Sequence, residues 1–163
     1  MRSVQIFSDG ACLGNPGPGG YGVILVHKEA RKELSGGARL TTNNRMELLG
    51  VIKGFEALKE RCSVRVVTDS QYVVDSMEKG WARKWRANAW LKSDRQPALN
   101  ADLWSRLLDL CAKHVVSFEW VRGHAGHPEN ERCDRLAVTA ARLPDLPRDD
   151  GYEAGPARSR LSV

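Results

Sequence analysis

The sequence of 163 residues has little cysteine and no long hydrophobic run. Its four cysteines (Cys12, Cys62, Cys111 and Cys133) lie 50, 49 and 22 residues apart. This spacing fits neither a zinc site nor a dense disulfide framework, so reduced thiols are expected. The longest apolar stretch, residues 21–26, is far shorter than the ~20 residues that cross a membrane, and the N-terminus lacks the apolar core of a signal peptide. These absences predict a soluble cytoplasmic protein without a membrane anchor.

The composition is that of one folded domain. Hydrophobic residues make up 42% of the chain, five of the residues are tryptophans, and there are no internal repeats. Such a chain can bury a core, and its length suits a single domain, which we place at residues 1–143. Beyond Leu143 the sequence is rich in proline and glycine and poor in apolar residues. Residues 144–163 are therefore expected to form a mostly flexible tail.

The positive charge is concentrated in one segment. The chain has 25 Lys and Arg against 20 Asp and Glu, a formal net charge of +5. Residues 79–95 alone hold six basic residues against one acidic residue, which equals the net charge of the protein. Three tryptophans are interleaved with them, a pattern typical of binding to a polyphosphate chain. A solvated amphipathic helix is the alternative interpretation.

Hydrophobic periodicity predicts an α/β fold. Strands are expected at residues 4–9, 21–27, 31–40, 65–68 and 115–121, and helices at 44–60, 71–79, 81–89, 102–113 and 128–142. A glycine- and proline-rich loop is expected at 14–20, and the third strand is interrupted at 35–37. The order βββαβα(α)αβα, with three adjacent strands first, predicts a five-stranded mixed sheet whose first three strands are antiparallel, flanked by helices.

Four carboxylates stand where such a fold could bring them together. Asp9 and Asp69 end predicted strands, and Glu47 and Asp134 lie early in predicted helices. Each also has an ordinary structural explanation. Asp9-Gly10 could form a turn, and Asn44 with Glu47 fits a capping box. Asp69 could cap a helix, and the helix dipole could favour Asp134 near a helix start. Gly50 and Gly54 share the helical face of Glu47, which suggests close approach to another backbone.

A convergent cluster of these carboxylates would need protons or cations. Two such charges about 4 Å apart repel by up to ~4 kcal/mol at an effective dielectric constant of 20. Oxygen ligands select a hard cation, and a small set of protein ligands suits Mg²⁺ better than Ca²⁺, with Mn²⁺ as a possible substitute. Two ions ~3.5–4 Å apart would bracket a phosphodiester, one activating water and the other stabilising the leaving oxygen.

A histidine lies near the last of these carboxylates. His124 stands in a glycine-flanked segment ten residues before Asp134, and its pKa range suits proton transfer. A zinc site of His124, His127 and Cys133 is the alternative, but the sequence offers no fourth ligand. His127 is instead expected to be a helix-capping or structural residue.

Four segments in this order resemble the type 1 ribonuclease H family, the bacterial ribonuclease HI group. They are residues 7–20, 42–47, 68–72 and 121–134, and the resemblance extends to about Tyr152. It implies an endonuclease that cuts the RNA strand of an RNA/DNA hybrid and leaves 5′-phosphate and 3′-hydroxyl ends. It also implies that Asp9, Glu47, Asp69 and Asp134 bind the metal, and that His124 transfers a proton or aids product release.

The resemblance further implies a set of substrate contacts. It assigns contacts in the minor groove of the hybrid, where 2′-hydroxyls distinguish RNA from DNA, to four residues. These are Asn15, Asn43, Asn44 and Gln71. The segment 79–95 matches the family's basic protrusion, which binds the DNA strand with Trp81 and Trp85 along it. Some relatives have an asparagine where this chain has Arg83 and Lys84, so phosphate binding is carried over to these two residues without its detailed geometry.

Two other functions fit the same residues. One is a hybrid-binding module without chemistry, which the full set of four carboxylates disfavours. The other is a DNA-cutting or strand-transferring relative, which the short chain and the matches at Asn43, Asn44 and Gln71 disfavour. A monomer without an obligate protein partner is expected.

Overall fold

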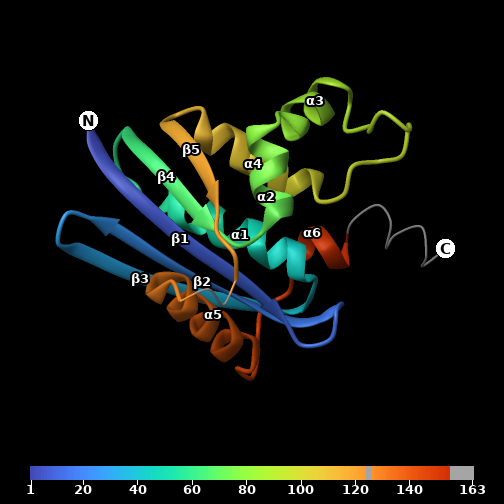
Figure 1. Cartoon of the computed structure of the whole chain (residues 1–163). Helices are drawn as coiled ribbons and strands as arrows, with labels where there is room; N and C mark the ends of the chain where they lie inside the picture. The colour runs from blue at the N-terminus through green and yellow to red at the C-terminus, as the bar shows by residue number, and fades with distance from the viewer. Residues whose placement is uncertain (124–125, 155–163) are drawn as a thin grey trace.

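The computed structural model describes residues 1–123 and 126–154 as one α/β unit (Figure 1). Its elements are β1 (Arg2–Cys12), β2 (Gly17–His27), β3 (Ala30–Thr41), α1 (Asn43–Glu56), β4 (Cys62–Thr68), α2 (Gln71–Glu78), α3 (Trp81–Ala87), α4 (Ala101–Cys111), β5 (Val115–Trp120), α5 (Pro128–Ala141) and α6 (Asp150–Glu153). The strands form one sheet in the order β3-β2-β1-β4-β5. The β1–β2 and β2–β3 pairs are antiparallel, whereas β1–β4 and β4–β5 are parallel, so the predicted mixed sheet is confirmed.

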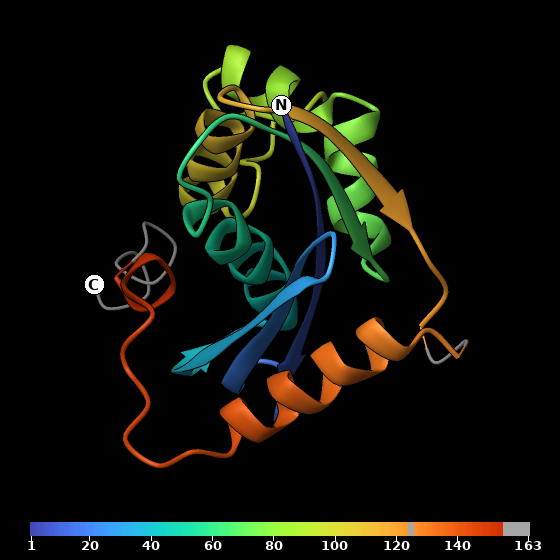
Figure 2. The ribbon, with the colours of Figure 1, turned by 90° about the vertical axis from the view of Figure 1, so that its left-hand side faces the viewer.

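Helices cover both faces of the sheet. Figures 1 and 2 show α5 on one face, across β2, with α1 and α4 on the other. The main core lies between the sheet and α1, α2 and α4, where Ile6, Val66, Leu48 and Trp104 are fully buried. None of the helices within the described ranges is long and apolar enough to cross a membrane. All four cysteines are free thiols, as their spacing predicts.

Glycines account for the main errors in the predicted strands. Residues 17–20, expected in a loop, are the start of β2, and β3 continues through residues 35–37 without a break. A Cβ on Gly20 would lie 2.2 Å from the Ala137 carbonyl oxygen, and one on Gly22 would lie 2.3 Å from that of Cys133. These glycines are therefore in the strand because α5 lies directly on the backbone of β2.

The helix starts differ from the expected caps. The hydroxyl of Thr42 caps α1 by accepting from the Arg45 backbone N–H, so Asn44 and Glu47 form no capping box. Ser70 caps α2 by accepting from the Val73 N–H, so Asp69 is not the cap. Two candidate carboxylates are thus left without the structural role that could have explained them.

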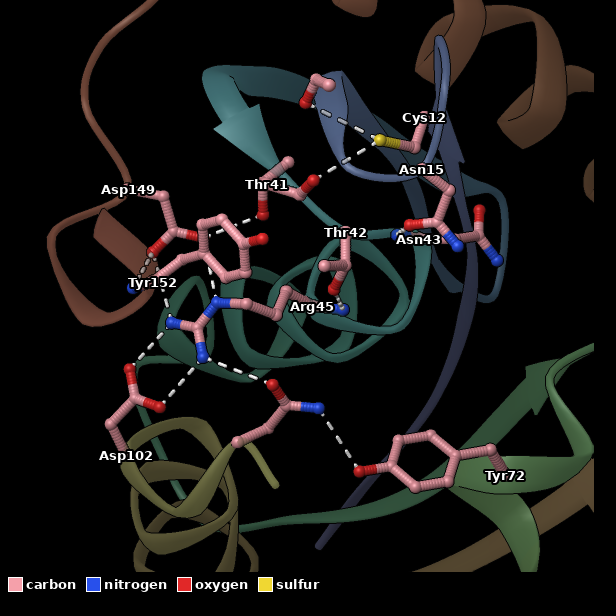
Figure 3. A network of polar contacts seen from close by, with 12 residues as sticks. Cys12, Asn15, Thr41, Thr42, Asn43, Arg45, Tyr72, Asp102, Asp149 and Tyr152 are labelled. Carbon is pink, nitrogen blue, oxygen red and sulfur yellow. Dashed lines mark hydrogen bonds and ion pairs between the residues drawn. The ribbon is translucent and has the colours of Figure 1, made fainter. Parts of the chain in front are cut away.

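The start of the predicted tail is held against the domain. The Arg45 guanidinium, 3% exposed, donates to Asp102 at 2.7 Å and to Asp149 at 2.8 Å, as Figure 3 shows. Asp149 also accepts from the Thr41 hydroxyl at 2.7 Å, and Arg39 pairs with Glu153 at 3.0 Å. Polar anchors thus hold residues 149–153 where the sparse apolar content predicts flexibility, and residues 155–163 lie outside the described part.

Candidate active site

Three carboxylates from separate segments meet at one place in the sheet. Asp9 lies in β1, Glu47 in α1, and Asp69 directly after β4. Ser8 and Thr68 pair in the parallel ladder, so the residues that follow them, Asp9 and Asp69, come to the same edge of two neighbouring strands. One oxygen of each of Asp9, Glu47 and Asp69 lies within 4.8 Å of the others. We call these three residues the acidic cluster.

Gly10 brings Glu47 to this position. It is part of β1 and pairs with Tyr21, so the expected turn at Asp9-Gly10 is absent and the strand continues to Cys12. A Cβ on Gly10 would lie 2.5 Å from the Glu47 backbone nitrogen, which shows how closely α1 approaches β1. Gly50 continues this approach, with its Cβ position 3.6 Å from the Asp9 carbonyl oxygen. The sequence prediction that Gly50 and Gly54 mark close approach to another backbone is therefore confirmed only at Gly50, because a Cβ on Gly54 would meet the Ile6 side chain, 2.8 Å from its Cγ2.

The buried charges in the acidic cluster are not compensated. Burial, and then the charge of Asp69, raise the pKa of Asp9 to about 8, against a weaker opposing hydrogen bond from the Gly10 N–H. Burial, followed by the charges of Asp9 and Asp69, raises the pKa of Glu47 well above its ordinary value. One Glu47 carboxylate oxygen, Oε2, is buried without a hydrogen-bond partner. The cluster therefore favours a bound cation, or protons in its absence.

Asp134 lies close to the acidic cluster without joining it. It is half-buried on α5, one residue after Cys133, whose backbone rests against Gly22. Gly22 pairs with Asp9 in the β1–β2 ladder, and the charge of Asp134 contributes to the raised pKa of Asp9. The predicted convergence of four carboxylates is therefore a compact group of three with Asp134 nearby.

The donor set of the acidic cluster fits a hard divalent cation. All its ligand atoms are carboxylate oxygens, the ligands that Mg²⁺ and Mn²⁺ prefer. Within residues 1–123 and 126–154, no second group of three or more potential metal ligands occurs. Cys133 is fully buried, and His127 is the N-cap residue of α5 but makes no side-chain capping hydrogen bond. His124 lies outside the described residues, so its predicted role remains a prediction.

The predicted polar contacts to substrate lie on neighbouring segments. The Asn15 side-chain oxygen accepts from the Asn43 backbone N–H at 3.1 Å, which ties the β1–β2 connection to the start of α1. Asn44 follows and is exposed, and Gln71 is an exposed residue at the start of α2. Because Glu47 lies in α1 and Asp69 lies two residues before Gln71, these amides flank the acidic cluster.

The basic limb, residues 79–95, combines packed and exposed side chains. Trp85 packs against the core, with its ring centroid 6.1 Å from that of Trp104. Trp81 is 38% exposed, with the Lys79 ammonium 5.2 Å from its ring centroid. Arg83 and Lys84 are exposed and form no ion pair with the described residues, whereas Arg86 pairs with Asp109 at 2.8 Å.

Two residues that the sequence did not single out contact Asp69. The Trp120 indole N–H donates to the Asp69 carbonyl oxygen at 3.0 Å, and Trp120 is 45% exposed. A Cβ on Gly123 would lie 2.7 Å from Asp69 Oδ2. In the sequence, Trp120 is an aromatic residue within the strand predicted at 115–121, and no local pattern marks it as a partner of Asp69. Its proximity to Asp69 depends on strand order, which local periodicity does not reveal.

Comparison with known proteins shows which family the chain belongs to. The RNase H family model matches residues 1–142. A curated ribonuclease H of Desulforamulus reducens is 64% identical over 149 residues, covering 91% of this chain and 94% of that protein. Among solved structures, LC9-RNase H1, a type 1 RNase H with the type 2 active-site motif, superposes with a TM-score of 0.77 at 31% identity, covering 98% of this chain and 84% of that one. LC11-RNase H1, solved in complex with an RNA/DNA hybrid, shares the fold with a TM-score of 0.63 at 23% identity, covering 85% of this chain and 96% of that one. The chain therefore belongs to the ribonuclease H family and is a nuclease of the hydrolase class.

Proposed function

We propose that this protein cuts the RNA strand of RNA/DNA hybrids internally, with two divalent cations, and leaves 5′-phosphate and 3′-hydroxyl ends. The observation that carries the proposal is the acidic cluster, in which two buried carboxylates have raised pKa values and one buried oxygen has no hydrogen-bond partner. Such a cluster costs stability unless a cation binds it. Membership of the ribonuclease H family, and the hybrid bound to LC11-RNase H1, support the choice of substrate.

Each polar residue then has a role. Asp9, Glu47 and Asp69 would hold Mg²⁺, with Mn²⁺ as a substitute, and Asp134 would extend the ligand set. When bound, the ions would promote attack by water and stabilise charge on the leaving oxygen. We propose His124 as the residue that transfers a proton near the reacting phosphate or aids product release.

Substrate binding would use polar residues on the segments that lie beside the acidic cluster. Asn15, Asn43, Asn44 and Gln71 offer amide and backbone groups to a minor groove, where the RNA strand presents 2′-hydroxyls. In the basic limb, Arg83 and Lys84 would bind phosphates of the DNA strand, and Trp81 and Trp85 would lie along it. The acidic cluster is complete within one chain, which supports a monomer without an obligate protein partner. The four free thiols are typical of the cytoplasm.

The proposal is tested with labelled RNA/DNA hybrid, double-stranded DNA and double-stranded RNA of one sequence. We expect cleavage of the RNA strand of the hybrid alone, with Mg²⁺ and not with EDTA. Binding of hybrid without cleavage would indicate a binding module, and cleavage of double-stranded DNA would indicate a DNA-cutting relative. Either result would contradict the proposal. Labelling both ends of the RNA, followed by phosphatase treatment, identifies the product termini.

A further inference from the structure

Asp69 is the member of the acidic cluster with the least support from burial. Asp9 and Glu47 are buried in β1 and α1, whereas Asp69 is half-buried and follows the last residue of β4. A residue that lies outside regular structure can move more easily than its two neighbours in a strand and a helix. Its position therefore requires a restraint that the strand ladder does not provide.

The end of β5 provides such a restraint. Past the last ladder pair, Thr68 with Trp120, the Val121 N–H donates to the Thr68 carbonyl oxygen at 3.0 Å. This bond brings the Trp120 indole N–H to the Asp69 carbonyl oxygen at 3.0 Å. Gly123 follows, and its missing side chain leaves room for Asp69 Oδ2. The segment 120–123 thus lies against both the backbone carbonyl group and the carboxylate of Asp69.

The other side of Asp69 is fixed by the start of α2. The Ser70 N–H donates to the Thr68 hydroxyl at 3.1 Å, and the Ser70 hydroxyl accepts from the Val73 N–H at 3.2 Å. With the following residue held in this way, the bond from Trp120 restrains the peptide group between Asp69 and Ser70. Because the Trp120 side chain is 45% exposed, it buries only part of its surface, and its hydrogen bond to Asp69 is its more distinctive contact.

We propose that Trp120 is a positioning residue that holds Asp69 within the acidic cluster and thereby sets the affinity of the cluster for Mg²⁺. The inference rests on the proposed function, because it assumes that the acidic cluster binds this ion. Groups that orient metal ligands without touching the metal commonly change metal affinity by about tenfold or more when removed. Gly123 acts in the same restraint by leaving space for the Asp69 carboxylate.

Trp120→Phe tests the inference, because it keeps an aromatic ring and removes the N–H donor. Isothermal titration of the metal-free protein with Mg²⁺ alone should show affinity about tenfold below wild type. With hybrid, kcat should fall at limiting Mg²⁺ and recover at high Mg²⁺, with KM for the hybrid unchanged. In wild type, the Trp120 indole N–H resonance should shift with the same Mg²⁺ midpoint as the calorimetric titration.

Val116→Ala is the matched control. Val116 lies on the same strand about 13 Å from Trp120 and packs against the core, so its truncation lowers stability without reaching Asp69. This variant should melt earlier and bind Mg²⁺ as wild type does. Equal loss of Mg²⁺ affinity in Val116→Ala and Trp120→Phe would show a general stability effect and overturn the inference.

Gly123→Ala provides an independent variant if Trp120→Phe folds poorly. Its Cβ would press on Asp69 Oδ2, so Mg²⁺ affinity should also fall. Wild-type Mg²⁺ affinity in the folded variants would overturn the positioning role and leave the proposed function intact. A wild-type protein that neither binds Mg²⁺ nor cleaves hybrid would overturn the proposed function, and this inference with it.

Discussion

Two clusters of carboxylates in this protein have opposite electrostatic environments. In the acidic cluster, burial and mutual repulsion raise the pKa of Asp9 to about 8. In the cluster around Arg45, burial raises the pKa of Asp102, but hydrogen bonds and charge from the guanidinium outweigh it and lower that pKa. The same pairing raises the pKa of Arg45 despite its burial. Carboxylates paired within the chain serve stability, whereas carboxylates left unpaired are available to a ligand.

The largest expected effect is on catalysis, from a change in the acidic cluster. Asp69→Asn removes one anionic metal ligand, so we expect cleavage of hybrid to fall by about 100-fold or more. Asp102→Asn, a matched change in the Arg45 cluster, should leave kcat near wild type, because Asp102 pairs with Arg45. Initial rates at saturating Mg²⁺ and hybrid give the comparison, with fluorescence anisotropy to confirm that Asp69→Asn still binds hybrid. Normal turnover by Asp69→Asn would contradict the assignment of the metal site.

The second effect is on stability, from the Arg45 cluster. Arg45→Met leaves Asp102 and Asp149 without their cation, so the free energy of unfolding should fall by about 3 kcal/mol, at the low end for buried pairs because Asp102 is 45% exposed. Urea denaturation measures the change, and Arg39→Met is the control. The Arg39 side chain, which pairs with Glu153, is 56% exposed, so its loss should cost less free energy of unfolding than the loss of Arg45. Equal losses of unfolding free energy in Arg45→Met and Arg39→Met would show that the burial of Arg45 adds no stability to its ion pairs.

The third effect is on the pH dependence of stability, to which Asp9 and Asp102 should contribute in opposite directions. The folded pKa of Asp9 is about 8, above its unfolded value near 4, so the folded protein holds the extra proton and stability without metal should fall as pH rises from about 4 to 8. The folded pKa of Asp102 is lowered, so its contribution is present above pH ~4 and is lost as pH falls further. Urea denaturation from pH 2 to 9 in EDTA tests both trends. Asp9→Asn should reduce the loss of stability between about pH 4 and 8, and Asp102→Asn should reduce the loss below pH ~4. An unchanged pH dependence in these variants would contradict the two pKa directions.

The smallest effect is on substrate binding, and it compares basic side chains without an ion-pair partner with one that has a partner. Arg83 and Lys84 form no ion pair with described residues, so replacing both with Gln should raise KM severalfold and leave kcat unchanged. The slope of log K against log salt should decrease by up to about 0.9 per lost phosphate contact. Arg106, which pairs with Glu56 at 3.1 Å, is the control, and Arg106→Gln should leave the slope unchanged. A lower kcat with unchanged KM would place Arg83 and Lys84 in the chemistry instead.

Local patterns predicted most of the elements and the three members of the acidic cluster. Helical periodicity placed α1, and the ends of the strands predicted at 4–9 and 65–68 marked Asp9 and Asp69, although β1 continues to Cys12. The start of β2 was missed because residues 17–20 have the composition of a loop, although α5 packed on the strand requires glycine at Gly20 and Gly22. The roles of Trp120 and Asp149 depend on partners 51 and 104 residues away, which local periodicity does not identify.

Titration of the metal-free protein with Mg²⁺ at pH 7 tests the central claim most directly. Because the pKa of Asp9 is about 8, this carboxyl group holds a proton at pH 7 that a bound cation would displace. Calorimetry in buffers of different ionisation enthalpy should show proton release on Mg²⁺ binding, and the release should decrease as the pH rises through the Asp9 pKa of about 8. Asp9→Asn should weaken binding and reduce the release. Mg²⁺ binding without proton release at pH 7, or with the same affinity in Asp9→Asn, would contradict the account.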